Sequence, residues 1–318
     1  MHQLIKSFVL TSFIWNIAPH AVAHENSTSY TANAKQLHHN ICHTTQICKH
    51  LTNQKITDYL SKAEKKEDII HLMNRKFEAQ PWHKYQKLST DRHRIQLGKT
   101  FYQQHQSAFE KLQATTQHVD NTTILGILGV ETNYGKNTGS YKVIDALYTL
   151  AFSYPGDPSN EYVQKRQKYF QSELATFLDL VEQKKLPIDL KGSYAGAFGM
   201  TQFMPSSYQD YAIAAPGKKT PADLYNPDDA IASINHYLIK KGHYDTKQPV
   251  MTAISKLNGL FGNSNKSTSP VARYETTPEK TYEYFIIGQN GKAILTYNNS
   301  VNYMRAVHEL GQTITKHA

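Results

Sequence analysis

The sequence has few of the residues that build membrane bundles, disulfide frameworks or disordered tails. Of its 318 residues, 39% are apolar and 19% are charged, and only two are cysteines. This balance excludes a membrane bundle and a disordered tail. A chain of this length forms one large domain or two small ones and buries about three quarters of its unfolded surface. It can therefore build a rigid groove from its own core.

Long apolar runs are also missing, apart from a short one near the start. Lys6 precedes the run at residues 8–15 (FVLTSFIW), and Ala21 and Ala23 form a small-x-small end. This pattern predicts a secretory signal that is cleaved after Ala23, because the run is too short to span a membrane. No cysteine ends the run, so no lipid anchor is expected. We therefore expect a soluble, exported protein.

The two cysteines, Cys42 and Cys48, lie six residues apart in a segment with several histidines. An oxidising compartment favours a small-loop disulfide between them. Metal binding by the cysteines and histidines is the alternative, but the spacing of a metal finger is absent. A catalytic cysteine is not expected.

Positive charge and tyrosine are both abundant. Lysine and arginine outnumber aspartate and glutamate by 35 to 26, which gives a net charge of +9, and 21 residues are tyrosine. Such a surface suits an anionic, hydroxyl-rich polymer such as nucleic acid or an acidic glycan. A charge excess that only keeps the protein in solution is an equally good explanation.

Hydrophobic periodicity predicts a mainly α-helical protein. Residues 24–55 are polar, and we expect an irregular arm there. Residues 282–287 and 293–297 flank the sequence QNGK, which favours a hairpin and thus a small β element near the C-terminus. The expected helices cover residues 59–76, 91–119, 124–131, 143–152, 162–183, 228–241 and 302–316.

Two segments differ from the amphipathic helices. Residues 124–131 (ILGILGVE) are apolar on every side, which predicts a buried helix. Gly126 and Gly129 each weaken it by up to about 1 kcal/mol, unless another backbone must approach closely. Residues 192–205 contain three glycines and several small residues. They suit the floor of a groove better than the interior of a helix.

Glu131 is the most informative single residue. It closes the apolar segment and precedes a polar turn at residues 132–135. A carboxyl at such a boundary is partly desolvated, which raises its pKa and keeps a proton available for general acid catalysis at a glycosidic oxygen. The alternative is a solvated acid at a capped helix end.

A second catalytic carboxyl is not evident. Conventional glycosidases place two carboxyls across the scissile bond. We expect Asp145 to make a buried structural bond or cap, and Glu173 and Asp179 to be solvated or to pair helices. One acid working alone implies that the sugar supplies its own nucleophile.

Three ordered motifs resemble the membrane-bound lytic transglycosylase B family. They are residues 129–135 (GVETNYG) with 144–152 (IDALYTLAF), residues 190–208 (LKGSYAGAFGMTQFMPSSY) and residues 297–303 (YNNSVNY). The resemblance runs from about residue 65 to the C-terminus. It implies a lysozyme-like helical domain that cleaves the bond between N-acetylmuramic acid and N-acetylglucosamine of peptidoglycan without water. Glu131 would protonate the leaving oxygen and then accept the proton of the muramyl 6-hydroxyl, which closes a 1,6-anhydro ring.

The resemblance also assigns residues that would bind the sugar. Ser193 and Gln202 would hydrogen-bond it, with Ser193 near the muramyl acetamide, and Tyr237 corresponds to a family tyrosine at the site. Core packing with a buried hydroxyl bond is the alternative for each tyrosine. Three further residues would lie on the opposite wall of the groove: Tyr297, Asn298 and Tyr303.

A basic pair on the helix at residues 162–183 has a counterpart in the family. Lys165 and Arg166 precede Tyr169, where the family carries two arginines that touch the muramyl carboxylate or peptide. Lys165 keeps the charge but lacks the bidentate fork of arginine. The alternative is a solvated helix face.

One departure from the family concerns calcium. Family members often carry a calcium loop after the sequence QFMP, but here residues 214–221 read AAPGKKTP. Calcium needs several oxygen ligands, usually anionic, and two lysines would repel it. We therefore expect no metal and no cofactor.

These inferences divide the chain into a signal (1–23), a polar arm (24–55) and a lysozyme-like domain (56–318) with a small embedded subdomain at about residues 205–295. We expect a periplasmic monomer that binds peptidoglycan strands and works with proteins of cell-wall synthesis or remodelling. The alternatives are a hydrolytic muramidase that uses Glu131 with water, and a non-catalytic peptidoglycan-binding protein on the same scaffold. Nucleic-acid binding has no supporting motif, and export argues against it.

Overall fold

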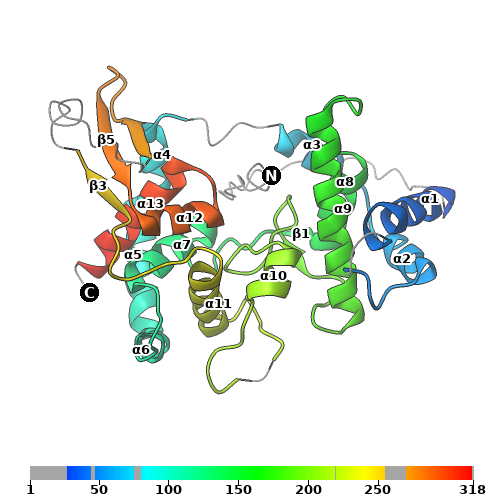
Figure 1. The fold of residues 1–318 in the computed structure, drawn as a ribbon, viewed down its shortest axis with the longest axis horizontal. Helices are drawn as coiled ribbons and strands as arrows, with labels where there is room; N and C mark the ends of the chain where they lie inside the picture. Colours follow the sequence, from blue (N-terminus) through cyan, green and yellow to red (C-terminus); the bar gives the residue numbers. More distant parts are fainter. Residues whose placement is uncertain (1–26, 44–46, 75–79, 219, 255–269, 317–318) are drawn as a thin grey trace. The chain divides into compact units, whose positions relative to one another are not determined.

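The computed structural model describes residues 27–43, 47–74, 80–218, 220–254 and 270–316 (Figure 1). The signal expected at residues 1–23 lies outside these ranges. Among the described residues, 27–74 and 137–210 form one compact unit, and 80–136 and 211–316 form a second. Helices dominate both units, which confirms the prediction of a mainly α protein. None of the helices in these ranges is long and apolar enough to cross a membrane.

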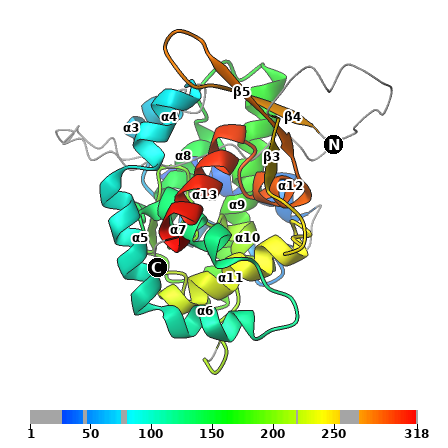
Figure 2. The ribbon, with the colours of Figure 1, turned by 90° about the vertical axis from the view of Figure 1, so that its left-hand side faces the viewer.

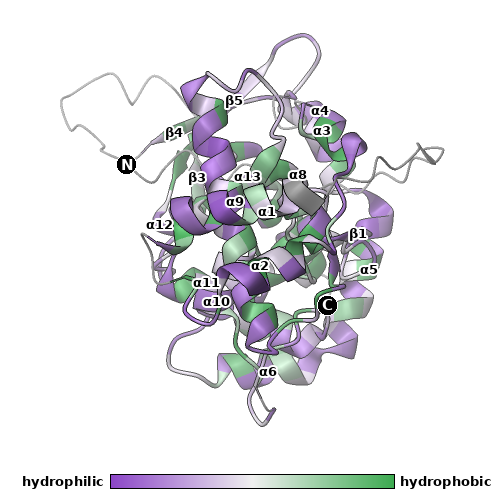
Figure 3. Cartoon of the chain, turned by 90° about the vertical axis from the view of Figure 1, so that its right-hand side faces the viewer, coloured by the Kyte–Doolittle hydropathy of each residue, from purple (hydrophilic) through white to green (hydrophobic). Residues whose placement is uncertain are grey.

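The first unit is built around α8 (Val143–Phe152) and α9 (Glu161–Glu182), which pack against each other. α8 is almost entirely buried, whereas α9 buries one face and turns charged residues outward (Figure 3). Two short strands, β1 (Tyr141–Lys142) and β2 (Lys191–Gly192), pair antiparallel. The other elements are α1 (Ser27–Leu37), the short π-helix η1 (His38–Cys42), α2 (Asn53–Leu60), α3 (Glu67–Met73) and α10 (Pro205–Tyr211).

The irregular, partly ordered arm expected at residues 24–55 is helical from Ser27 to Cys42, where α1 and η1 lie, which the prediction missed. Its few apolar residues have helical spacing, which the surrounding polar residues hide. Ala34, Leu37 and Ile41 recur every three or four residues and are buried. Cys42 and Cys48 form the expected disulfide, with their Cα atoms 5.1 Å apart.

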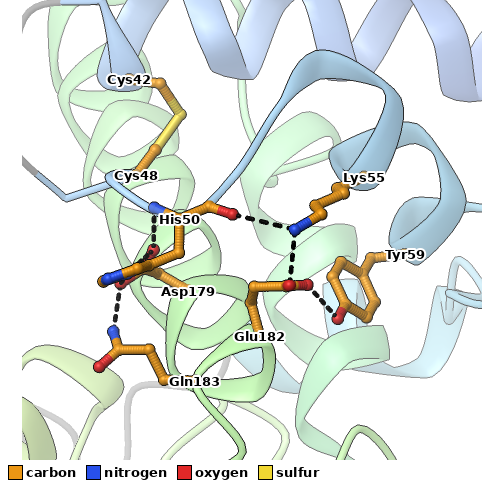
Figure 4. A network of polar contacts seen from close by, with 8 residues as sticks. All are labelled: Cys42, Cys48, His50, Lys55, Tyr59, Asp179, Glu182 and Gln183. Atoms are coloured by element: carbon orange, nitrogen blue, oxygen red, sulfur yellow. Dashed lines mark hydrogen bonds and ion pairs between the residues drawn. A yellow bond between two sulfur atoms is a disulfide. The ribbon is translucent and has the colours of Figure 1, made fainter.

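A polar network joins the arm to α9 (Figure 4). The backbone N–H of His50 donates to Asp179 Oδ1, and His50 Nδ1 lies 3.1 Å from the same oxygen. Lys55 and Tyr59 both donate to Glu182, at 2.6 and 2.8 Å. Asp179 is buried and anchors the arm. The expectation of a solvated or helix-pairing Asp179 is therefore wrong.

The second unit contains a three-stranded antiparallel sheet in the order β3-β5-β4, with α12 beside it (Figure 2). The helix expected at residues 91–119 is two helices that meet at His105. The strands are β3 (Met251–Ala253), β4 (Val271–Glu275) and β5 (Tyr282–Ile287). The helices are α4 (Trp82–Ser89), α5 (Arg92–Gln104), α6 (Gln106–Gln113), α7 (Asn121–Thr132), α11 (Pro227–Lys240), α12 (Gln289–Tyr297) and α13 (Val301–Thr315).

Glycines bring the backbones of α7 and α13 into direct contact. A Cβ on Gly126 would lie 2.0 Å from the carbonyl oxygen of Val307, and one on Gly311 would lie 1.9 Å from that of Thr122. The numbering of these contacts shows that the two helices run antiparallel. A glycine is needed at position 126 because another backbone approaches it closely, which is the reason considered in the sequence analysis. At Gly129 the neighbours are side chains, not backbone. The prediction of a buried α7 is confirmed, since residues 123–132 are all buried.

The expected hairpin around residues 289–292 is wrong, because this segment begins α12. An Asn-Gly pair favours a turn in isolation, but here both residues make tertiary contacts that are compatible with a helix. The buried Asn290 side chain donates to the carbonyls of Asp245 and Gln248 and accepts from the Asp245 N–H. Gly291 lies where a Cβ would be 2.3 Å from the carbonyl oxygen of Val250. β5 pairs instead with β3 and β4.

Candidate active site

Glu131 lies in the last turn of α7, and only 3% of it is exposed. The chain leaves the helix through three residues with positive φ: Asn133 at 51°, Tyr134 at 58° and Gly135 at 84°. The Oγ1 of Thr132 accepts the Gly135 N–H and closes this turn. Backbone conformations of this kind cost about 1–3 kcal/mol each at non-glycine residues and concentrate at functional sites. The sequence predicts a partly desolvated carboxyl at this position, and the structure buries it.

Tyr303 is the hydrogen-bond partner of this carboxyl. Its hydroxyl donates to Glu131 Oε1 at 2.7 Å, and its side chain is fully buried. Burial raises the pKa of Tyr303 well above its ordinary value, and the negative charge of Glu131 raises it further. Tyr303 therefore keeps its proton at neutral pH and donates it in the hydrogen bond to one oxygen of Glu131.

Tyrosine rings extend from this pair across the second unit. The Tyr297 ring lies nearly parallel to that of Tyr303, with centroids 6.5 Å apart, and Tyr237 meets Tyr297 edge-on at 4.9 Å. Tyr297 is half-buried, but Tyr237 is buried and its hydroxyl donates to the Thr296 carbonyl at 2.6 Å. Burial also raises the pKa of Tyr237. The second unit thus brings together Glu131, Tyr303, Tyr297 and Tyr237, with Tyr237 as a packed support.

The YNNSVNY motif is the joint between α12 and α13. The backbone N–H of Asn298 donates to the Ile294 carbonyl and ends α12. Ser300 Oγ accepts the Tyr303 N–H and caps α13. Asn298 is 2% exposed, and its backbone carbonyl accepts the Ser300 N–H. The motif therefore fixes Tyr297 and Tyr303 on the two sides of one tight connection.

Two residues that support this joint were missed by sequence reasoning. The Tyr274 hydroxyl donates to the carbonyl of Val301, the first residue of α13. The Arg305 guanidinium lies over the rings of Trp82, Tyr274 and Phe285, with its centre 4.5 to 4.9 Å from their centroids. Cation–π contacts of this kind hold the start of α13 against α4 and the sheet. The available signal was an arginine two residues beyond Tyr303 in an otherwise apolar stretch.

Ser193 and Gln202 shape the glycine-rich turn of the first unit. Ser193 Oγ accepts the Ala197 N–H at 3.0 Å, and Ser193 is 1% exposed. Gln202 has a φ of 49°, and its Nε2 donates to the carbonyls of Thr138 and Gly199. The segment thus forms a compact turn rather than a helix, as its glycines predict.

The basic pair on α9 separates into two different environments. Lys165 is exposed and pairs with Glu161 at 2.5 Å. Arg166 is 4% exposed, and its guanidinium lies over the rings of Tyr154, Tyr169 and Phe170. The alternative of a solvated helix face therefore holds for Lys165, whereas Arg166 is buried.

The other carboxyls singled out in the sequence make structural bonds. Asp145 is buried and accepts the Glu64 N–H, and burial raises the pKa of Asp145. This confirms the buried structural bond expected there. Glu173 is also buried, and both its oxygens accept hydrogen bonds from Ser206 at the start of α10. Of the two alternatives expected for Glu173, the solvated one is wrong and helix pairing is confirmed, because Glu173 joins α9 to the first turn of α10.

Solved structures with this fold are lytic transglycosylases of the lysozyme-like class. SltB1 from Pseudomonas aeruginosa is 26% identical, with a TM-score of 0.74 over 91% of this chain and 99% of that chain. Escherichia coli SLT35, solved in complex with bulgecin A, is 28% identical, with a TM-score of 0.73 over 90% and 93% of the two chains. These matches confirm the predicted lysozyme-like helical fold.

Residues 34–312 match the transglycosylase SLT domain family, and the chain belongs to this family of enzymes. The membrane-bound lytic murein transglycosylase B of Escherichia coli K12 is 31% identical in an alignment 291 residues long, which covers 82% of this chain and 78% of that protein. The resemblance seen in the three motifs is thus confirmed. It extends further toward the N-terminus than the motifs indicated, since the family match begins inside α1.

Proposed function

We propose that the protein is a lytic transglycosylase that cleaves the bond between N-acetylmuramic acid and N-acetylglucosamine in peptidoglycan, with Glu131 as its acid and base. The observation that carries this proposal is the buried hydrogen bond from Tyr303 to Glu131 Oε1. Burial favours the protonated carboxyl, whereas a hydrogen bond from a hydroxyl favours the carboxylate. The two effects act in opposite directions on the carboxyl. A residue that gives and retakes one proton needs this balance.

The proposed reaction uses one proton and no water. With Oε1 accepting from Tyr303, the acid proton belongs on Oε2 of Glu131. It passes to the glycosidic oxygen as the bond to the muramyl anomeric carbon breaks. The Glu131 carboxylate then takes the proton of the muramyl 6-hydroxyl, whose oxygen bonds to the anomeric carbon. The enzyme returns to its starting state, and the product carries a 1,6-anhydro ring.

The remaining predicted residues have binding roles in this proposal. Tyr297 offers a half-buried ring to the sugar and rests on Tyr237, which acts as a support. Asn298 belongs to the same wall, and Ser193 and Gln202 form the glycine-rich turn that binds the sugar. The muramyl carboxylate or peptide is bound from α9 by Lys165, Arg166 and Tyr169. Aromatic neighbours hold the guanidinium of Arg166 in place.

The proposed setting is the periplasm, where a monomer acts on glycan strands together with cell-wall synthesis or remodelling proteins. Support comes from the apolar run before Ala23 and from the disulfide, which suits an oxidising compartment. In this assignment residues 1–23 are the signal and residues 24–55 an arm bound to α9. Residues 56–318 are the lysozyme-like domain, which embeds a small subdomain at about 205–295 that holds the sheet.

The test is digestion of purified sacculi by the wild type and by Glu131→Gln, with mass spectrometry of the products. We expect anhydro-muramyl ends from the wild type and none from Glu131→Gln, which should still bind sacculi. Glu182→Gln is the control, because that carboxyl accepts from Lys55 and Tyr59 in the contact between α2 and α9 and its loss should leave activity unchanged. Products heavier by one water molecule would identify a hydrolytic muramidase. Unchanged turnover in Glu131→Gln would remove that residue from its role.

A further inference from the structure

The segment that leads into α11 is organised around the side chain of Asp229. Asp229 is buried, and each of its carboxylate oxygens accepts a backbone N–H: Oδ1 from Ala215 and Oδ2 from Asp223. Asn226 caps α11 by accepting the Asp228 N–H on its Oδ1. The side chain of the neighbouring Asp228 lies in the same first turn of α11. Adjacent carboxylates repel each other, and a nearby cation relieves that repulsion.

Lys218 brings an ammonium group to these oxygens. Its Nζ lies 2.6 Å from Asn226 Oδ1, 3.4 Å from Asp228 Oδ2 and 3.5 Å from Asp229 Oδ1. The backbone of the same residue is also fixed, since the Lys218 N–H donates to the Ala215 carbonyl at 3.0 Å. One lysine thus connects the start of the segment to the first turn of α11. Its side chain is 37% exposed, compared with 5% for that of Asp229.

Calcium does not fit this arrangement. Escherichia coli SLT35, 29% identical with a TM-score of 0.72, has been solved in complex with calcium. Calcium takes about six to eight oxygen ligands at roughly 2.3–2.6 Å. Here the Asp229 oxygens already bind two N–H groups, and the ammonium of Lys218 lies against the same side chain. Within the described ranges, no group of three or more His, Cys, Asp or Glu side chains is placed to hold a metal.

We propose that the ammonium of Lys218 is the structural cation of this segment and takes the place that a metal ion would hold. The ammonium donates to Asn226 Oδ1 and forms ion pairs with Asp228 and Asp229, and so it ties the segment to α11. Asp228 also lies 3.6 Å from His105 Nδ1, whereas Lys218 meets both aspartates. The fold of the segment then needs no divalent cation, so chelators leave the protein unchanged. This inference concerns stability and stands apart from the proposed function.

The first test is thermal unfolding of the wild type in EDTA and in calcium chloride. We expect the same midpoint in both, and a midpoint raised by calcium would overturn the proposal. The second test is Lys218→Met, which keeps the length of the side chain and removes its charge. We expect its midpoint to fall by about 2–4 °C. Lys218→Arg, which keeps a cation, should stay near the wild type.

The matched control is Lys65→Met, because Lys65 pairs with a single exposed carboxylate, that of Glu67. Surface pairs of this kind contribute little, so its midpoint should not move. Equal losses in Lys218→Met and Lys65→Met would contradict the proposal.

Discussion

Removing the hydroxyl of Tyr303 should shift the pH dependence of cleavage in a defined direction. The hydroxyl donates to Glu131 Oε1 at 2.7 Å in a fully buried setting, so Tyr303→Phe deletes a donor to a carboxylate without changing the ring. A hydrogen bond to a charged group contributes about 1.5–3 kcal/mol. At about 1.36 kcal/mol per pH unit, this energy corresponds to a displacement of the pH dependence by roughly one to two pH units.

The sign follows from the form of Glu131 that the donor favours. Tyr303 stabilises the carboxylate, so its loss makes Glu131 hold its proton to higher pH. The first step needs the protonated acid, and activity is therefore lost as pH rises. In Tyr303→Phe this basic limb should move upward by roughly one to two units, and the plateau rate should fall because Oε1 is no longer held. Titration of Tyr303 itself cannot cause the limb, because burial raises the pKa of this hydroxyl well above its ordinary value.

The assay is the rate of release of soluble products from sacculi over a series of buffers of equal ionic strength. Tyr244→Phe is the matched control, since its buried hydroxyl also donates to a carboxylate, Asp120 Oδ2 at 2.9 Å, at the opposite end of α7. It should leave the pH profile in place. The reasoning fails if Tyr303→Phe lowers the rate with no shift of the limb, or if both variants shift it equally.

Two further variants test the fold that carries the site. Cys42→Ser with Cys48→Ser opens a loop whose ends are six residues apart, and the loop-entropy relation gives a loss of about 2 kcal/mol in unfolding free energy. Urea titration with and without reductant checks this, and a wild type insensitive to reductant would contradict it. Gly126→Ala places a methyl group 2.0 Å from the carbonyl oxygen of Val307, so overpacking should cost about 1–3 kcal/mol. An unchanged urea midpoint in this variant would refute the close approach of α7 and α13.

Local sequence predicts α7 well because its apolar pattern is compatible with only one environment, the buried core. A run that is apolar on every side has to be buried, and a carboxyl that closes it is desolvated with it. The arm and the expected hairpin fail for the opposite reason. Ala34, Leu37 and Ile41 are diluted by polar neighbours, and the QNGK sequence favours a turn until buried contacts of Asn290 override it. In both segments long-range packing determines the structure, and the spacing of residues along the chain carries no information about that packing.

The same limit applies to the site. The motifs indicate Glu131 and Tyr303, but not that one donates to the other, because 172 residues separate them. They also place Tyr237 at the site, but not the bond that its hydroxyl donates to the Thr296 carbonyl. Arg166 is enclosed by aromatic side chains that no local pattern reveals. A resemblance can name the residues of a site, whereas partners and burial have to come from the fold.

The double glycine contact between α7 and α13 has a consequence for how this enzyme can move. Because Gly126 touches the backbone at Val307 and Gly311 touches it at Thr122, neither helix can slide along the other without a collision at two crossing points. Glu131 and Tyr303 lie on these two helices, so the close approach at both glycines also keeps their hydrogen bond in register.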